Sequence, residues 1–455
     1  MNEEKSAASF VRELIEGQGL RAYVLTFGCQ QNEADSEKLL GMCEEMGYTP
    51  TETADDADLI LVNTCAVREH AELRALSIIG GFKRRRAQNP RLIIGVCGCM
   101  AAREDRVAAL RKSYPYVSFT MRPADLARMP EFVLEVMTRH RRKFSEGDLT
   151  TSITEGIPTH RKSSYRAYVT VMYGCNNFCS YCIVPHVRGR ERSRESGEVY
   201  EEVKALVAQG YRDIMLLGQN VNSYQSDCDF ASLLRRLDEI EGDYILRFMS
   251  SHPKDLSDSL IAAVAECRHV EPHFHLPVQA GSDKVLKEMN RRYGTEKYLS
   301  LVEKLRRAVP DIVLTSDVMV GFPGETEEDF EATLSLLRKA RFDMVYSFIY
   351  SPRPGTPAAE REDQVEEGAK GERMRRLLAV QDEISLGHNE RLVGKCLRVL
   401  ADCPSEKEAG VMNGRTDGGK LVHFPADASL SGKFCFVEIE KAEPYALLGR
   451  LVKEG

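Results

Sequence analysis

Residues 21–135 repeat one pattern three times, and this repetition constrains the fold more than any other feature of the chain. Each copy has an apolar strand-like run, a loop that carries a cysteine, and an amphipathic helical stretch; the runs are "AYVLTFGC", "ADLILVNTC" and "RLIIGVCGC". Cys29, Cys65 and Cys99 are spaced by 36 and 34 residues, which is typical of successive βα units in a parallel sheet. We therefore predict an N-terminal α/β domain with a parallel sheet over residues 21–140.

The cysteines of the three copies are predicted to lie close together. Ligands of parallel α/β sheets bind beyond the carboxyl ends of the strands, and each cysteine follows a strand run. A joint metal site is predicted at this edge, with three unrelated buried thiols as the alternative. Cys97 competes with Cys99 for the third position: Cys97 lies within the strand run, whereas Cys99 follows Gly98 in the loop.

The rest of the chain changes character twice. Residues 141–164 have mixed charge with Gly, Pro and Ser, which predicts a linker. Six strand runs alternate with helical runs over residues 165–388, which predicts a partial (β/α)6 barrel, because a closed barrel of this kind needs eight strands. Short alternating strands over residues 389–453 predict a small β-barrel of a type that often binds oligonucleotides. The predicted fold class is α/β with this C-terminal β-barrel.

A second cysteine group directly follows the first strand of the central region. Cys175, Cys179 and Cys182 have the spacing C-x₃-C-x₂-C in "GCNNFCSYC". Zinc sites usually take four ligands, whereas three thiolates on one short loop can hold three irons of a four-iron cluster and leave the fourth iron open. His186 offers a fourth zinc ligand under the alternative interpretation. An iron-sulfur cluster with an open position is therefore predicted.

The compartment and the charge restrict the function classes. The first residues lack the basic flank and apolar stretch of a signal peptide, and no apolar run reaches the length of a membrane helix, so a cytoplasmic protein is expected. Thiols stay reduced there, and 13 cysteines then favour metal binding or catalysis.

A net charge of −7 argues against generic binding of polyanions, although basic stretches can override it locally. One such stretch is "RGRERSR" at 188–194. Its alternating arginines would present guanidiniums to a line of phosphates if the run is extended. A solvated face is the alternative interpretation.

The cysteine loop after the first strand of a partial barrel resembles the radical S-adenosylmethionine superfamily. The chain as a whole resembles its methylthiotransferases, which end in an RNA-binding TRAM module, and in particular the tRNA-modifying MiaB type. The likeness rests on these segments: "TFGCQQNEADSE", "VNTCAVREHAE", "GCMAAR", "YGCNNFCSYCIVPHVRGRERSR", "LLGQNVNSY", "SSHPKDLSDSLI", "HLPVQAGSDKVLKEMNRRY", "DVMVGFPGETEEDF" and "YSPRPGTPAA".

This resemblance implies transfer of a methylthio group to C2 of N6-isopentenyladenosine next to the anticodon of tRNA. It implies two 4Fe-4S clusters, with Cys175, Cys179 and Cys182 on the radical-generating cluster, and an auxiliary cluster held by one cysteine from each N-terminal copy: Cys29, Cys65 and Cys99. S-adenosyl-L-methionine would supply both the methyl group and the radical.

Further residues follow from the resemblance alone. Contacts to S-adenosylmethionine are implied for six polar positions after barrel strands: Gln219, Asn220, Ser251, His252, Gln279 and Ser282. The sequence departs from the family pattern at Gln225, where glycine is expected, and at Ala280, where serine is usual. The expected partners are a tRNA anticodon stem-loop and an electron donor such as flavodoxin or ferredoxin. No membrane is expected to take part, and a monomer is expected.

Two alternatives remain at this stage. The same chemistry can act on threonylcarbamoyladenosine in tRNA or on an aspartate of a ribosomal protein. A protein of another class would use its cysteines for structural zinc and bind RNA without catalysis.

Overall fold

The computed structural model describes residues 6–66, 69–147, 149 and 153–454. The chain forms two compact units. One holds the residues up to Lys162 with Met172–Asn177 and Cys182–Arg194, and the other holds Ser163–Val171, Phe178–Tyr181 and the residues from Glu195 on. The predicted central barrel and C-terminal barrel thus belong to one unit.

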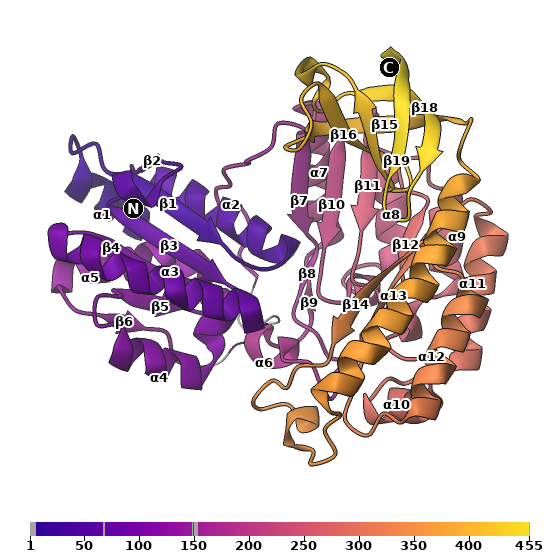
Figure 1. Ribbon diagram of the computed structural model, residues 1–455. Helices are drawn as coiled ribbons and strands as arrows, with labels where there is room; N and C mark the ends of the chain where they lie inside the picture. The colour runs from indigo at the N-terminus through magenta and orange to yellow at the C-terminus, as the bar shows by residue number, and fades with distance from the viewer. Residues whose placement is uncertain (1–5, 67–68, 148, 150–152, 455) are drawn as a thin grey trace. The chain divides into compact units, whose positions relative to one another are not determined.

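The first unit is built on a parallel sheet of six strands in the order β2-β1-β3-β4-β5-β6. The predicted strand runs form the three central strands, and each pairs with the next in parallel register (Figure 1). The bounds of the six strands are β1 (Arg21–Thr26), β2 (Thr49–Pro50), β3 (Leu59–Thr64), β4 (Ile93–Gly98), β5 (Phe119–Met121) and β6 (Lys143–Phe144). The prediction of a parallel α/β domain is confirmed.

Helices cover both faces of this sheet because the buried strands carry apolar side chains on both sides. One face packs on α1 (Ala7–Ile15), α2 (Gln30–Glu45) and α5 (Met129–Arg139), through residues such as Val11, Leu39 and Phe132. The other face packs on α3 (Glu69–Gln88) and α4 (Glu104–Ser113). Between them these helices bury the strands and leave the carboxyl edge of the sheet to the loops.

The segment predicted as a linker is partly built into this unit. Residues 148 and 150–152 of it lie outside the described part of the chain. Lys143 and Phe144 form β6 and pair with β5, which adds a strand that their mixed charge did not predict. Further on, the backbone N–H of His160 donates to the carbonyl of Glu37, and Arg161 pairs with the Glu37 carboxylate at 2.9 Å. Tertiary hydrogen bonds therefore order residues whose composition is that of a loop.

The central part of the second unit has six parallel strands, as predicted. Three form the sheet β11-β10-β7, three form the sheet β12-β13-β14, and a single bridge joins Leu246 of β11 to Val270, just before β12. The strands are β7 (Arg166–Thr170), β10 (Asp213–Leu217), β11 (Ile245–Phe248), β12 (His273–His275), β13 (Val313–Val320) and β14 (Met344–Ile349). An open (β/α)6 barrel results.

Helices alternate with these strands and form the outer layer (Figure 1). Their bounds are α7 (Ser196–Ala208), α8 (Phe230–Asp238), α9 (Asp258–Glu266), α10 (Asp283–Glu288), α11 (Thr295–Ala308), α12 (Glu327–Ala340) and α13 (Glu367–Glu390). Aromatic side chains join the layers: Phe248 of β11 lies edge-on to Phe230 of α8, with ring centroids 5.2 Å apart. The barrel is thus held by packing between strand and helix layers.

The C-terminal residues form a closed five-stranded barrel in the order β15-β16-β17-β19-β18, which confirms the predicted small β-barrel. Its strands are β15 (Cys396–Pro404), β16 (Val411–Thr416), β17 (Leu421–Pro425), β18 (Phe434–Ala442) and β19 (Leu447–Glu454). It packs on the amino ends of the central strands, where Leu400 and Phe434 form one cluster with Ile245 and Tyr165. The carboxyl ends of those strands, at the other end of the barrel, stay available for a site.

Within the described ranges, no helix combines the length and the apolar content needed to cross a membrane.

Candidate active site

The three predicted cysteines of the first unit come from adjacent strands and meet at the carboxyl edge of the sheet. Cys29 follows β1 at the start of α2, Cys65 follows β3, and Cys99 follows β4. The turn before Cys29 needs glycine, because Gly28 has a φ of +125° and a Cβ there would lie 2.8 Å from the Cβ of Cys65. The loop of Cys29 thus lies directly on Cys65.

The same edge places Cys99, rather than Cys97, beside the other two thiols. The pKa of Cys99 is raised to about 11, chiefly by burial, with Arg188 lowering it and the nearby Cys65 and Cys29 contributing to the rise. Cys97 belongs to β4, and its side chain lies in the apolar core with Cys43. The two cysteines are separated because β4 ends at Gly98, whose φ of +89° turns the chain before Cys99.

A buried arginine reaches this thiol group. Arg188, at the end of α6 (Val184–Arg188), donates from Nε to Cys99 Sγ at 3.3 Å and from Nη2 to Asp35 Oδ2 at 2.9 Å. Burial alone would lower the pKa of Arg188, but the adjacent Cys99 and Asp35 raise it above its ordinary value. The guanidinium thus stays charged beside sulfur.

The stretch "RGRERSR" does not present all its arginines to solvent, so the prediction that they bind a line of phosphates is corrected. Arg188 is buried, and Arg194 is buried in an ion pair with Glu155. Arg192 lies in the short strand β9 (Arg192–Ser193), which pairs with β8 (Met172–Tyr173). Arg190 is the exposed member. The four arginines do not form one line of phosphate-binding groups.

The second cysteine group lies on the loop that follows β7 and β8. Cys175 and Cys179 are each 8% exposed, and Cys182 is half-buried. The backbone N–H of Cys175 donates to the carbonyl of Gly189 at 3.1 Å. Backbone hydrogen bonds therefore hold the loop around the thiols.

A second buried arginine contacts this group within the second unit. Arg291 Nη1 donates to Cys179 Sγ at 3.4 Å, and its Nη2 donates to the carbonyl of Pro277 at 2.8 Å. The neighbouring Asn290 donates to the carbonyl of Phe178 at 2.9 Å. Asn290 and Arg291 thus hold the cysteine loop through Phe178 and Cys179.

Two of the polar residues predicted to contact S-adenosylmethionine have unused hydrogen-bonding atoms. Asn220 follows β10 and Ser251 follows β11; Asn220 Oδ1 and Ser251 Oγ are buried and have no partner in the structure. The Asn220 side chain is oriented by its Nδ2, which donates to Asp255 at 2.8 Å. Buried polar atoms are rarely left unpaired in a folded protein. These two fit a bound polar ligand at the carboxyl ends of the strands.

The other four residues predicted to contact S-adenosylmethionine differ in burial and in hydrogen bonding. Gln219 is half-buried, and Gln279 is buried with a φ of +71°. His252 is buried, and burial and then Arg291 lower its pKa to about 2, so the imidazole is neutral. The Ser282 hydroxyl instead caps α10 and donates to Asp329 Oδ1 at 2.6 Å, so local structure accounts for it.

The donor chemistry fits iron-sulfur clusters at both cysteine groups. Each group brings three thiols, which are soft ligands suited to such clusters. Across the part of the chain that the structure describes, no three His, Cys, Asp or Glu side chains are close enough to hold a single metal ion.

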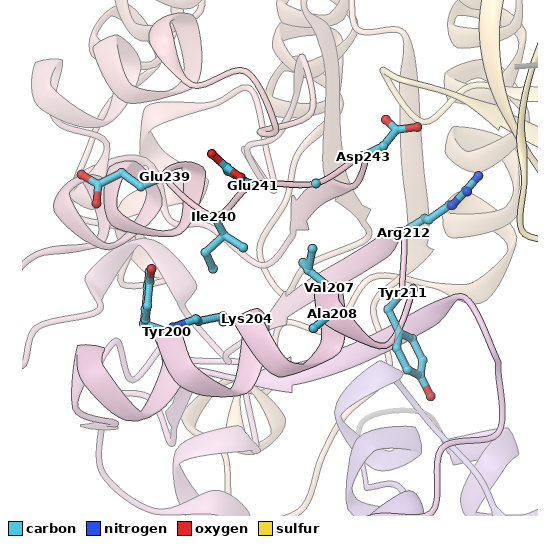
Figure 2. A pocket seen from close by; sticks show the side chains of 12 residues that line it. Tyr200, Lys204, Val207, Ala208, Tyr211, Arg212, Glu239, Ile240, Glu241 and Asp243 are labelled. Atoms are coloured by element: carbon cyan, nitrogen blue, oxygen red, sulfur yellow. The ribbon is translucent and has the colours of Figure 1, made fainter.

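An open pocket lies elsewhere on the barrel, at the amino ends of β10 and β11 (Figure 2). Its lining comes from the end of α7, with Tyr200 and Lys204, and from the loop after α8, with Glu241 and Asp243. Ligand sites of parallel sheets lie at the carboxyl ends of strands. This pocket is therefore separate from the candidate site at Asn220 and Ser251.

Comparisons with known proteins give three family matches. Residues 169–337 match the Radical SAM superfamily, residues 21–121 match the Uncharacterized protein family UPF0004, and residues 390–452 match the TRAM domain.

Curated relatives cover nearly the whole chain. The tRNA-2-methylthio-N(6)-dimethylallyladenosine synthase of Thermoanaerobacter pseudethanolicus is 46% identical over 458 residues, with 99% of this chain and 97% of that protein covered. The synthase of the same name from Acetivibrio thermocellus is 48% identical over 432 residues, with 94% and 90% covered.

Solved structures share the fold at low identity. The radical S-adenosylmethionine methyltransferase TsrM from Kitasatospora setae has a TM-score of 0.55 and 16% identity, with 74% of this chain and 75% of that chain covered. The cobalamin-dependent S-adenosylmethionine radical enzyme OxsB has a TM-score of 0.52 and 11% identity, with 81% and 57% covered.

Proposed function

The chain belongs to the tRNA-2-methylthio-N(6)-dimethylallyladenosine synthase family of the radical S-adenosylmethionine superfamily, and we propose that it methylthiolates C2 of N6-isopentenyladenosine next to the anticodon of tRNA. Membership of the superfamily implies a 4Fe-4S cluster and S-adenosylmethionine as cofactors. Beyond what the superfamily implies, we propose a second cluster, its cysteine ligands and the nucleoside that is modified.

The observation that carries the proposal is the presence of two separate groups of three thiols. We assign Cys175, Cys179 and Cys182 to the cluster that binds S-adenosylmethionine, and the N-terminal group to an auxiliary cluster: Cys29, Cys65 and Cys99. When bound, the first cluster supplies the electron that cleaves S-adenosylmethionine to a carbon radical, and the second supplies sulfur. A second group of thiols provides a place for the sulfur source that methylthiolation needs.

Protein residues then bind and orient the cofactor. Asn220 Oδ1 and Ser251 Oγ are assigned as acceptor and hydroxyl partners of S-adenosylmethionine, because both are buried and unpaired. Gln219, His252 and Gln279 complete the expected contacts. His252 is buried and neutral, and its Nδ1 accepts from the backbone N–H of Lys254 at 3.1 Å, so its Nε2–H can donate one hydrogen bond there without adding charge.

The partner is tRNA, for which the TRAM domain provides an RNA-binding module. We assign the domains as residues 21–140, 165–388 and 389–453, and expect flavodoxin or ferredoxin as the electron donor. Threonylcarbamoyladenosine tRNA and a ribosomal protein aspartate remain the alternative substrates. The zinc-stabilised RNA-binding alternative predicts a colourless protein without sulfide.

The test is anaerobic reconstitution with iron and sulfide, followed by reaction with reductant, S-adenosylmethionine and an isopentenylated anticodon stem-loop. Mass spectrometry of the digested RNA should show the modified adenosine heavier by one SCH₂ group, with release of 5′-deoxyadenosine. Release of 5′-deoxyadenosine without the mass gain would reject this substrate, and the same assay would then be run on the alternative substrates.

Cysteine variants test the division of labour. The wild type should bind roughly eight irons, as two four-iron clusters. Cys179→Ala should abolish cleavage of S-adenosylmethionine, whereas Cys65→Ala should retain cleavage and lose sulfur insertion. Cys403→Ala is the matched control, because this thiol is exposed on the C-terminal barrel. Equal loss of both activities in the first two variants, with both proteins folded, would contradict the assignment.

A further inference from the structure

The buried guanidinium of Arg188 lies in a hydrogen-bond network that reaches all three loops of the auxiliary group. Arg188 donates to Cys99 Sγ at 3.3 Å and to Asn32 Oδ1 at 3.1 Å. Asn32 Oδ1 also accepts from Cys29 Sγ at 3.5 Å, and Asn32 Nδ2 donates to the carbonyl of Thr64, which precedes Cys65, at 2.9 Å. One cation and one amide thus connect the three cysteine positions.

The buried guanidinium of Arg188 is shared between a carboxylate and a cysteine sulfur. Arg188 is 6% exposed, and its carboxylate partner Asp35 is 5% exposed. Gln31 Nε2 donates to the other carboxylate oxygen, Asp35 Oδ1, at 3.0 Å. Arginine keeps its proton under all ordinary conditions, and a buried cation needs its donors satisfied. Its Nε has Cys99 Sγ as its acceptor, so the cation is oriented towards a position that a cluster would make more negative.

We propose that Arg188 is a positioning residue that donates a charged hydrogen bond to the Cys99 thiolate and thereby raises the reduction potential of the auxiliary cluster. This rests on the proposed function, which places a cluster on Cys29, Cys65 and Cys99. Hydrogen bonds to ligand sulfur and a nearby positive charge both favour the reduced, more negative cluster.

The position of Arg188 in the chain gives the proposal a further consequence. Arg188 follows Cys182 by six residues, and two residues between them, Ile183 and Val187, pack in one cluster with Cys99. The segment that closes the radical cysteine group therefore also carries the cation of the auxiliary site.

The test measures the potential of the auxiliary cluster by itself. In full-length protein with Cys175, Cys179 and Cys182 replaced by alanine, the remaining cluster is titrated and followed by electron paramagnetic resonance. Arg188→Met should lower the ratio of reduced to oxidised cluster at fixed potential at least tenfold, which is about 59 mV for one electron.

Two further variants complete the design. Arg188→Lys keeps the charge but loses the planar fork, so a smaller decrease is expected. Arg190→Met, an exposed arginine two residues further on, should leave the potential unchanged.

Each outcome decides one point. An unchanged potential in Arg188→Met with full iron content overturns the inference. If Arg188→Met does not retain the cluster, the reduction potential is measured in Arg188→Lys instead. Loss of the cluster from both variants would overturn the inference and show that Arg188 has a purely structural role. If the protein with Arg188 intact holds no cluster on its N-terminal cysteines, the proposed function fails at the auxiliary site, and the inference fails with it.

Discussion

The guanidinium of Arg247 lies between two buried carboxylates of the central barrel, and its removal should show what the loss of this buried cation costs. Its Nε donates to Asp213 Oδ1 at 3.0 Å, and its Nη1 donates to Glu271. All three side chains are 4% exposed or less. Although burial by itself would lower the pKa of Arg247, Glu271 and Asp213 raise it, so the residue is a buried cation.

Arg247→Met should therefore destabilise the second unit strongly. Loss of one partner from a buried ion pair costs about 3–5 kcal/mol, because the other charge stays in the interior. At about 2 °C or more per kcal/mol for a large domain, the melting temperature of this unit should fall by roughly 6 °C or more in differential scanning calorimetry.

The matched control is Arg375→Met, since Arg375 pairs with Glu372 at 2.7 Å while the two side chains are 76% and 55% exposed. Exposed pairs contribute about 0–1 kcal/mol, so the control should stay close to the wild type. A loss below about 1 kcal/mol in Arg247→Met would refute the reasoning.

The loss of stability in Arg247→Met should also depend on pH. In Arg247→Met, Asp213 keeps Arg166 at 2.7 Å, whereas Glu271 stays buried without its guanidinium partner. A buried carboxylate that has lost its cation takes up a proton more readily. The folded variant then binds more protons than the unfolded one, and its stability rises as the pH falls. The deficit relative to the wild type should be smaller at pH 5 than at pH 8, and a deficit that grows on acidification would contradict the assignment.

Three further predictions concern the candidate site. Gly98→Ala should lose the auxiliary cluster, because Gly98 has a φ of +89° and a Cβ there would lie 2.4 Å from Asn63 Oδ1; iron analysis should fall from roughly eight to roughly four per chain, and a full count would contradict this. Ser251→Ala should weaken binding of S-adenosylmethionine about fivefold or more in calorimetry, because it loses one hydrogen bond of about 1 kcal/mol, and it should leave the stability of the free protein unchanged. Ser282→Ala should instead keep the binding and lose about 1 kcal/mol of protein stability, because the cap of α10 is removed. His252 should stay neutral in ¹⁵N NMR titration down to pH 4, since its pKa is lowered to about 2; protonation near pH 6.5 would show that the imidazole is solvated.

The periodic features of the sequence predicted the architecture well. Strand runs at regular spacing predicted both parallel sheets, because a buried parallel strand needs a continuous apolar run and a helix to return the chain. The same spacing predicted that Cys29 and Cys65 follow adjacent strands. The linker was less well predicted: Lys143 and Phe144 form a strand because β5 leaves an edge to pair with, and neither residue indicates this by its type.

The assignments that depend on side-chain direction needed the structure. Cys97 and Cys99 are both cysteines near a strand end, and only the end of β4 at Gly98 shows that Cys99 faces the other thiols. The predicted role of Ser282 as a cofactor contact has a local competitor, since its hydroxyl caps α10. Sequence likeness identifies such positions without showing which atoms remain unpaired.

By itself, the sequence determined the order of the elements, the family and the positions of the two cysteine groups, because these follow from local spacing and apolar pattern. The tertiary structure alone decided the roles of the basic residues. Arg188 and Arg291 belong to stretches that resemble solvated or RNA-binding runs, yet both are buried and donate to cysteine sulfur. The physical reason is that a charged side chain is stable in the interior only where acceptors from distant parts of the chain converge on it, and that convergence exists only after folding.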